Sequence, residues 1–162
     1  MNITYKNDIS VEAVNAIRKS MGWRQDNTEQ LQSALDGSAL IVAAYEGNRA
    51  IAMARLIWDG GGGASISGVL IIPEYRNTEV ERRLISQILD YLRERLKPGF
   101  GIQVDIRAFG YQESLCEDIG FQLSTKERRG VPMHICLTNQ IELTDKMFKQ
   151  MGYEEDVTKR EG

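Results

Sequence analysis

The most constraining feature of this sequence is the segment 78–96, which is typical of one long amphipathic helix. Apolar residues recur there at four-residue steps: Val80, Leu84, Ile88, Leu92 and Leu96. This spacing places a wide apolar stripe on one face of a helix and charged residues on the other. The stripe requires an apolar surface to pack against, and Pro98-Gly99 predicts where the helix ends.

The segments before this helix predict a sheet that can supply the surface. The expected elements are a short strand at 3–5, an amphipathic helix over 10–21, and a second helix capped by Asp26 or Asn27 and ended by Gly37. Strand-like runs follow at 39–45, 50–58 and 64–72, with turn residues at 46–49 and 59–63 between them. Three consecutive strands of this kind predict an antiparallel meander.

The segments after the long helix add parallel pairing to the meander. The expected elements are a strand at 102–108, a short helix at 112–119 ended by Gly120, strands beginning at Phe121 and over 133–137, and a helix over 143–151. This order predicts an α/β (mixed α+β) fold with a central mixed, twisted sheet and helices on both faces. Residues 1–138 are expected to form a single domain. Residues 139–162 are expected to form a C-terminal helix and charged tail, packed on that domain or extending from it.

Charge and residue usage argue against several classes of function. A net charge of −3 with scattered basic residues argues against a nucleic-acid partner. The longest apolar run, 39–45, is too short to span a bilayer, so no membrane partner is expected. Two cysteines without a secretory segment indicate reduced thiols and a cytoplasmic location. The lone His134 argues against a multi-histidine metal site, so no metal is expected.

Several local patterns, taken in order, resemble one known family. They are Ser20-Met-Gly-Trp23, Ala54-Arg-Leu-Ile-Trp-Asp-Gly60, Val69-Leu-Ile-Ile-Pro-Glu-Tyr-Arg76, Leu115-Cys-Glu-Asp-Ile-Gly-Phe121 and Gly130-Val-Pro-Met133. Their order and spacing over residues 3–137 resemble the GNAT superfamily of acyl-CoA-dependent N-acetyltransferases, in particular a bacterial subgroup. The resemblance implies the GNAT fold, acetyl-CoA as co-substrate, and direct attack of an acceptor amine on the thioester.

The resemblance also implies a loop that holds the pyrophosphate of CoA at the start of the long helix. In the family this loop follows the pattern Gln/Arg-x-x-Gly-x-Gly/Ala, and the preceding strand lines the pantetheine arm. The corresponding cofactor-binding residues here are Leu70, Ile71, Arg76, Asn77, Thr78, Glu79, Val80 and Glu81. Glutamates occupy both small-residue positions, where bulk and negative charge oppose a phosphate. Alternatively, they are ordinary helix-starting residues that complement the helix dipole, and Glu79 can pair with Arg83.

The remaining candidate residues each have two interpretations. Cys116 occupies the position where the family often has a tyrosine acid, and it is either a catalytic acid or a buried thiol. Tyr111 could substitute for it as the catalytic acid. Trp23 could line the acceptor pocket or belong to the core. Ser67 and Asp105, together with Ser65, are candidates for contacting the substrate or ordering a water molecule.

Two functions follow from these patterns. The first is an acyl-CoA-dependent N-acyltransferase that transfers acetyl from acetyl-CoA to a small-molecule amine acceptor, as a monomer or homodimer. The second is a catalytically inactive GNAT-fold binding or regulatory protein with lost or weak CoA binding. The two glutamates predict weak binding of acetyl-CoA under either hypothesis, because a negative charge near an anionic ligand lowers its affinity.

Overall fold

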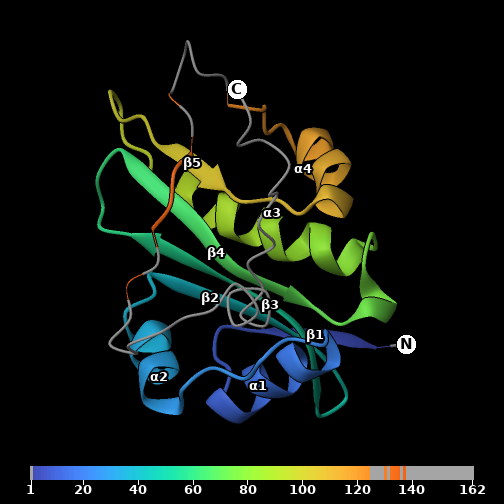
Figure 1. Cartoon of the computed structure of the whole chain (residues 1–162). Coiled ribbons are helices and arrows are strands. Elements are labelled where there is room, and N and C mark those ends of the chain that lie inside the picture. Colours follow the sequence, from blue (N-terminus) through green and yellow to red (C-terminus); the bar gives the residue numbers. More distant parts are fainter. Residues whose placement is uncertain (1, 125–129, 131, 136, 138–162) are drawn as a thin grey trace, which may run out of the picture. The chain divides into compact units, whose positions relative to one another are not determined.

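A mixed sheet with the strand order β1-β2-β3-β4-β5 organises the structure (Figure 1). Its strands are β1 (Ile3–Lys6), β2 (Leu40–Glu46), β3 (Arg49–Trp58), β4 (Gly63–Ile71) and β5 (Gln103–Ile106). The first four strands pair antiparallel, and β5 pairs parallel to β4. The computed structural model describes residues 2–124, 130, 132–135 and 137, and these strands lie in a compact unit, Met1–Phe121. A second unit comprises Gln122–Gly162.

Helices cover both faces of this sheet. Helices α1 (Val11–Ser20) and α2 (Thr28–Asp36) lie on one face, and α3 (Glu79–Arg93) and α4 (Glu113–Ile119) lie on the other (Figure 1). The burial of β3 reflects this arrangement, because four consecutive residues, 51–54, are at most 2% exposed. A strand that is buried on alternate positions only would have one face in water. The predicted mixed sheet with helices on both faces is therefore confirmed.

The helix starts follow from local capping. The Ser10 hydroxyl accepts a hydrogen bond from the Ala13 N–H at 3.1 Å and caps α1. Of the two cap candidates for α2, Asn27 is the cap, and its side-chain oxygen accepts from the Gln30 N–H at 3.0 Å. Asp26 instead forms an ion pair with Arg18 at 3.1 Å. Both caps satisfy N–H groups that a helix leaves unpaired at its start.

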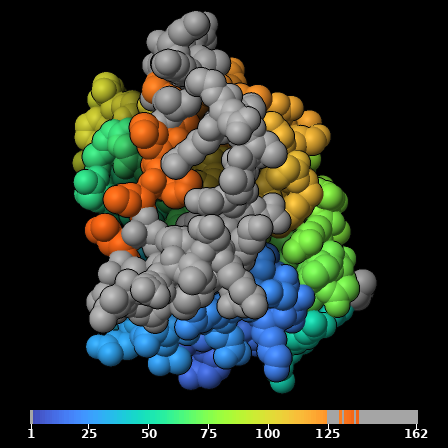
Figure 2. All heavy atoms as spheres, in the orientation of Figure 1, coloured from blue at the N-terminus to red at the C-terminus, as the bar shows by residue number. Residues whose placement is uncertain are grey.

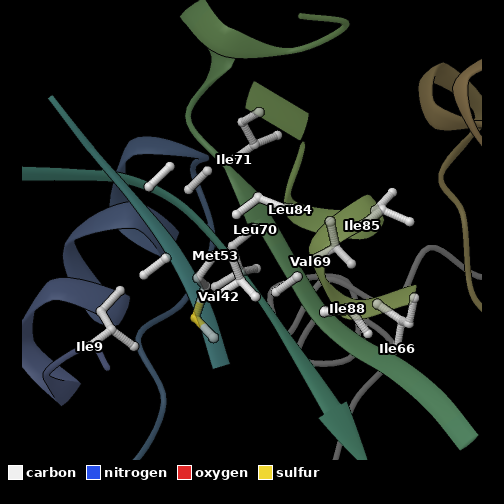
Figure 3. Packing of buried hydrophobic residues seen from close by; sticks show 14 of the residues in the cluster. Ile9, Val42, Met53, Ile66, Val69, Leu70, Ile71, Leu84, Ile85 and Ile88 are labelled. Carbon is white, nitrogen blue, oxygen red and sulfur yellow. The ribbon is translucent and has the colours of Figure 1, made fainter. Parts of the chain in front are cut away.

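The apolar stripe of α3 forms one wall of the core. Leu84, Ile85 and Ile88 are fully buried, and they belong to the same hydrophobic core as Ile66 of β4 (Figure 3). The expected stripe is one turn too long, because α3 ends at Arg93 and Leu96 lies beyond it with 45% of its surface exposed. Pro98 explains the early end, since proline disfavours helical backbone in the residue before it and cannot donate to the preceding turn.

The expected strands at the C-terminal end are not seen in the described residues. Phe121 and residues 122–124 are not in a strand, and neither are 133–135 and 137. An alternation of apolar residues forms a strand only when a neighbouring strand pairs with it. Met133, Ile135 and Leu137 are each more than 80% exposed. The expected helix over 143–151 lies outside the described residues, and the domain boundary at 138/139 stays a prediction.

A pair of leucine substitutions tests this account of α3. Leu84→Ala should lower the free energy of unfolding by about 2–5 kcal/mol, because it leaves a cavity in a closely packed core. Leu96→Ala removes the same atoms from an exposed position and should cost less than about 1 kcal/mol. Chemical denaturation of both variants measures the difference, and equal losses would place Leu96 in the core and extend α3.

Candidate active site

Strands β4 and β5 are paired only over part of β4. The registered pairs run from Gly63 with Gln103 to Ile66 with Ile106, while β4 continues through residues 67–71. The other edge of β4 stays paired with β3 as far as Ile71. One edge of residues 67–71 therefore has no registered partner strand among the described residues. Such an edge can accept an extended ligand by main-chain hydrogen bonds.

A β-bulge lies where the two strands part. Arg55 pairs with Ser67 and Met53 pairs with Leu70, so the register shifts across the intervening Gly68 and Val69. Gly68 has a φ of 58°, which glycine adopts without steric cost. A bulge bends its strand and increases the local twist. This bend gives a physical reason why β4 loses β5 immediately beyond Ile66.

The loop after β4 leads into α3 through a short 3-10 helix, η1 (Pro73–Tyr75). Asn77 has a φ of 56°, a left-handed conformation that asparagine tolerates better than most residues. The Thr78 hydroxyl donates to the Tyr75 carbonyl at 2.6 Å and accepts from the Val80 N–H at 3.3 Å. Thr78 is thus the N-cap of α3, and the helix starts one residue after the beginning of the predicted segment 78–96. Figure 2 shows this part of the chain, in light green, at the surface between the blue N-terminal helices and orange α4.

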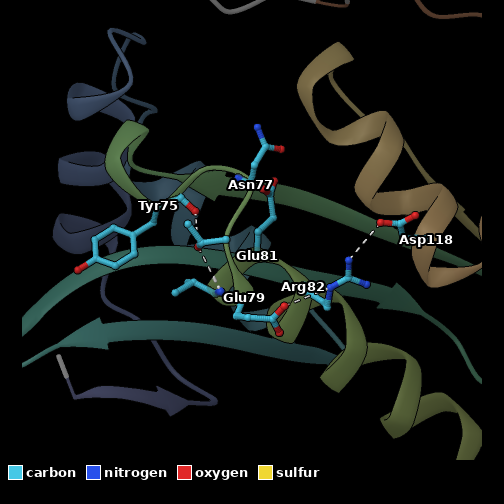
Figure 4. Close-up of polar contacts among 8 residues, drawn as sticks. Tyr75, Asn77, Glu79, Glu81, Arg82 and Asp118 are labelled. Carbon is cyan, nitrogen blue, oxygen red and sulfur yellow. Dashed lines mark hydrogen bonds and ion pairs between the residues drawn. The ribbon is translucent and has the colours of Figure 1, made fainter.

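The Glu81 side chain extends from α3 toward the loop that contains Asn77 (Figure 4). It is fully buried, and its Oε2 accepts a hydrogen bond from the Asn77 N–H at 3.1 Å. Its Oε1 accepts from Nε2 of Gln112, also buried, at 2.6 Å. Gln112 Oε1 in turn accepts from the Phe109 N–H at 2.9 Å. One carboxylate therefore joins the loop, α3 and the 3-10 turn η2 (Gly110–Gln112).

Glu79 differs from Glu81 in direction. Its side chain is 85% exposed and forms an ion pair with Arg82 at 3.5 Å (Figure 4). The expected partner, Arg83, instead lies over the ring of Tyr5, 5.5 Å from its centroid. Arg82 also reaches Asp118 of α4 at 3.4 Å. Of the two glutamates, only Glu79 adds an exposed negative charge at the start of α3, where it complements the helix dipole.

A row of aromatic rings connects two residues that the sequence predicted separately. Trp23 makes an edge contact with Phe109 at 5.5 Å, and Phe109 stacks on Tyr111 at 6.0 Å. The guanidinium of Arg76 lies over the Tyr111 ring, 4.8 Å from its centroid. The Tyr111 hydroxyl and Arg76 Nε are buried atoms without a hydrogen-bond partner in the described part of the chain. Unpaired buried polar atoms are uncommon in proteins, and a catalytic role is one of the explanations for such an atom.

The two candidate acids, Tyr111 and Cys116, lie in different environments. Burial raises the pKa of Tyr111, and the nearby charge of Arg76 opposes that shift. Burial also raises the pKa of Cys116, and the charge of Glu81 raises it further. The Cys116 side chain belongs to the hydrophobic core, with 4% of its surface exposed. Both groups hold their protons at neutral pH, but Cys116 is packed among apolar side chains.

The remaining predicted residues lie along the parting strands. Leu70 and Ile71 have buried side chains, so only their main-chain atoms can contact a ligand. Ser65 is paired with Asp105 across β4 and β5, and Ser67 is paired with Arg55 across β3 and β4. Asp105 is exposed and accepts a hydrogen bond from Gln103 Nε2 at 3.1 Å. The sheet thus brings the predicted serines and Asp105 to one face.

Three residues of this region were not predicted from the sequence. No local sequence pattern marks Gln112 or Phe109, because their contacts depend on chain segments that are far apart in the sequence. Arg55 had a weak signal, because it is a charged residue within a strand of apolar residues. Glu81 also had a signal in Thr78-x-x-Glu81, the pattern in which a glutamate reaches back to the N–H groups at its own helix start.

A family model describes most of the region that forms this site. Residues 11–107 match the "Acetyltransferase (GNAT) family". The chain belongs to this family. Membership indicates acetyl transfer from an acyl-CoA in general, and the GNAT fold expected from the sequence is confirmed. No protein of curated function matches the sequence significantly.

Solved structures of GNAT proteins share the fold at low sequence identity. An acetyltransferase-like protein of unknown function from Staphylococcus aureus has a TM-score of 0.72 and 20% identity, covering 83% of this chain and 100% of its own. A GNAT-family acetyltransferase from Streptococcus pneumoniae has a TM-score of 0.65 and 19% identity, covering 86% and 98%. N-acetylglutamate synthase from Neisseria gonorrhoeae, solved with coenzyme A and L-arginine, has a TM-score of 0.59 and 15% identity, covering 81% and 29%.

The described residues show neither a metal centre nor a membrane-spanning helix. They contain no group of three or more His, Cys, Asp or Glu side chains placed to hold a metal ion. No described helix is both long enough and apolar enough to cross a membrane.

The buried position of Glu81 predicts that the same change, Glu to Gln, costs more stability at Glu81 than at Glu79. Glu81→Gln replaces an oxygen that accepts a hydrogen bond by an amide that donates, so one buried donor faces another. It should lower the free energy of unfolding by about 2–3 kcal/mol. Glu79→Gln, on the exposed side of the same helix turn, should cost less than about 1 kcal/mol. Urea denaturation measures both values, and similar small losses would contradict the inward position of Glu81.

The environment of Cys116 predicts slow chemical modification. In a Cys136→Ser background, iodoacetamide should alkylate Cys116 in the native protein at least about tenfold more slowly than in urea, because burial limits access and the raised pKa reduces the thiolate. Mass spectrometry over time, at one pH near 8, measures both rates. Equal rates in the native and unfolded protein would show an accessible thiol and restore Cys116 as a candidate acid.

Proposed function

We propose that this protein transfers an acetyl group from acetyl-CoA to a small amine by direct attack of the amine on the thioester. The observation that carries the proposal is the parting of β4 from β5 at the Gly68 bulge, on the strand that leads through η1 to the N-terminus of α3. The parting exposes a strand edge, and the helix start supplies N–H groups that attract anions. Both features suit one ligand with an extended amide-containing arm and a phosphate group.

The residues of this region fit acetyl-CoA in part. The main chain of Leu70 and Ile71 lies on the open edge and would hold the pantetheine arm, and the start of α3 at Thr78 and Glu79 would face the phosphates. The Asn77 N–H already donates to Glu81, and exposed Glu79 places a negative charge at the helix start. Weak binding of acetyl-CoA is therefore expected, with the thioester arm held better than the phosphates.

Tyr111 suits the role of proton donor better than Cys116. Bound acetyl-CoA supplies an activated acyl group; the amine nitrogen forms a bond to its carbonyl carbon, and the carbon–sulfur bond breaks. The departing thiolate then takes a proton from the Tyr111 hydroxyl. The proton lost by the amine goes to solvent, and the tyrosinate regains a proton from solvent before the next turnover. The hydroxyl is buried and unpaired among the described residues, whereas the Cys116 thiol is enclosed in the core.

A second function is favoured by one specific observation. The hydrogen bond from Asn77 to Glu81 removes a donor from the phosphate loop, as expected of a GNAT-fold module that no longer catalyses acetyl transfer. Such a protein would bind or regulate without turnover. Activity measurements separate the two functions directly.

The decisive experiment measures amine-dependent release of the CoA thiol. The protein should acetylate at least one member of a panel of small amines, seen by mass spectrometry of the product. Tyr111→Phe should reduce kcat at least about tenfold, because a proton donor contributes about 10²–10⁴ to the rate. Its stability should be unchanged or slightly higher, since the substitution removes an unpaired buried hydroxyl.

Cys116→Ser is the matched control, and its kcat should stay within about threefold of the unmodified protein if the thiol has no role in proton transfer. If Tyr111→Phe is as active as the unmodified protein, another group must supply the proton to the departing thiolate. Absence of amine-dependent thiol release from the unmodified protein would favour the inactive module instead.

A further inference from the structure

Arg55 of β3 is a partly buried cation without an ion-pair partner among the described residues. Its Nη1 donates one long hydrogen bond, 3.5 Å, to the Ser38 hydroxyl. That hydroxyl donates to the Ala34 carbonyl at 2.7 Å, at the end of α2. In the described part of the chain, none of the ion pairs involves Arg55. Most of the donors of this guanidinium are therefore available to a ligand.

The electrostatic setting of Arg55 supports this interpretation. Burial lowers the pKa of Arg55, and no nearby charge offsets that shift. The guanidinium nevertheless stays protonated, because its ordinary pKa is far above neutrality. A charge removed from water is unfavourable unless an opposite charge or several hydrogen bonds compensate it. The long hydrogen bond to Ser38 compensates the buried charge only weakly. A bound anion would therefore give the Arg55 guanidinium the partner that the described residues do not supply.

The side chain of Arg55 packs against the bulge. Gly68 is exposed, and a Cβ atom at this position would lie 3.4 Å from Arg55 Nε and 3.6 Å from its Cγ and Cδ. The lack of a side chain at Gly68 thus lets the Arg55 side chain approach the exposed backbone of the bulge. The bulge lies where β4 parts from β5, at the start of the open edge along which the proposed function places the pantetheine arm. An anion bound by Arg55 would therefore lie beside that edge.

The groups around Arg55 indicate the kind of anion. Ser67 is directly opposite Arg55 and on the same face of the sheet, so its hydroxyl can donate to the same ligand. Asp105 is two strands away, and its carboxylate forms no ion pair with Arg55 among the described residues. One guanidinium with a hydroxyl matches a carboxylate, which accepts two parallel hydrogen bonds from arginine. A doubly charged phosphate would face the carboxylate of Asp105 with a single described cation beside it.

We propose that Arg55, with Ser67 beside it, binds the carboxylate of an α-amino acid acceptor at the Gly68 bulge. This proposal rests on the proposed function, because it names the class of amine that receives the acetyl group. The amine and the carboxylate of an amino acid are attached to the same carbon. Holding the carboxylate at Arg55 therefore keeps the amine near the parting of β4 and β5. Arg55 is a specificity residue here and takes no part in proton transfer.

The test measures binding in the absence of acetyl-CoA. The probes are a panel of L-amino acids and their carboxamides, which differ in the negative charge, and the method is amide NMR titration at a fixed pH. The unmodified protein should bind at least one amino acid at least about tenfold more tightly than its carboxamide, since a paired carboxylate is worth more than about 1.4 kcal/mol. Arg55→Gln should remove that preference while binding of the carboxamide changes less than about twofold.

A second pair of variants tests the same charge without touching Arg55. Gly68→Asp and Gly68→Asn are both compatible with the left-handed backbone better than other residues. Asp places a carboxylate next to the guanidinium and should bind the amino acid at least about tenfold more weakly than Asn, which has the same shape without the charge. Circular dichroism confirms that each variant is folded, and the Gly68 pair decides the matter if Arg55→Gln does not fold.

The outcomes separate this inference from the proposed function. Equal binding of acids and carboxamides, no binding of any amino acid, or an unchanged preference in both Gly68→Asp and Arg55→Gln would overturn the carboxylate site. Acetylation of neutral amines would still stand in that case. Carboxylate-dependent binding that disappears in Arg55→Gln would support the site even if acetyl transfer is never observed, and the proposed function alone would then fail.

Discussion

The buried carboxylate of Glu81 is the interaction on which the architecture of this site depends. It accepts hydrogen bonds from the Asn77 N–H and from Gln112, and so joins the loop before α3 to the turn before α4. A carboxylate enclosed in a protein is stable only when donors replace the water that it has lost. The same two segments also meet where the Arg76 guanidinium lies over the Tyr111 ring. The left-handed backbone of Asn77 and the position of Tyr111, one residue before Gln112, both follow from this arrangement.

The same interaction limits how the loop can hold a phosphate. A helix start binds anions through N–H groups that have no partner in the helix. Here two of the N–H groups at the N-terminal side of α3 already have acceptors. The Glu81 carboxylate accepts from the Asn77 N–H, and the Thr78 hydroxyl accepts from the Val80 N–H. The glutamate at this position therefore affects ligand binding by occupying a donor, and its charge does not face the solvent. Repulsion from the surface comes from Glu79 alone of the two, and salt screens an exposed charge of this kind.

The sequence predicted the elements well as far as α4 and the contacts between distant elements poorly. Caps and periodicity are local, so Ser10, Thr78 and Gly120 mark helix ends that the structure confirms. The direction of Glu81 depends on the backbone of Asn77 and on Gln112, 31 residues further along the chain. Local patterns carry no information on such a pair. The sequence likewise could not predict that Arg55 has no ion-pair partner among the described residues, because a basic residue in a strand is ordinarily exposed or paired. Only the strand register shows that Gly68 lies next to Arg55.

The parting of β4 and β5 separates the proposed proton donor from the residues that are proposed to bind the acceptor. Arg76 and Tyr111 are beyond the carboxyl ends of the parallel strands, where the aromatic row from Trp23 also ends. Arg55 and Ser67 project from one face of the sheet, next to the bulge. An acceptor held on the sheet face would approach a thioester lying along the open edge of β4 from the side, while the proton donor stays at the strand ends. Because the bulge bends β4 between these two groups, a change at Gly68 would alter the approach of the acceptor without disturbing the bonds of Glu81, which lie on α3 and its loop.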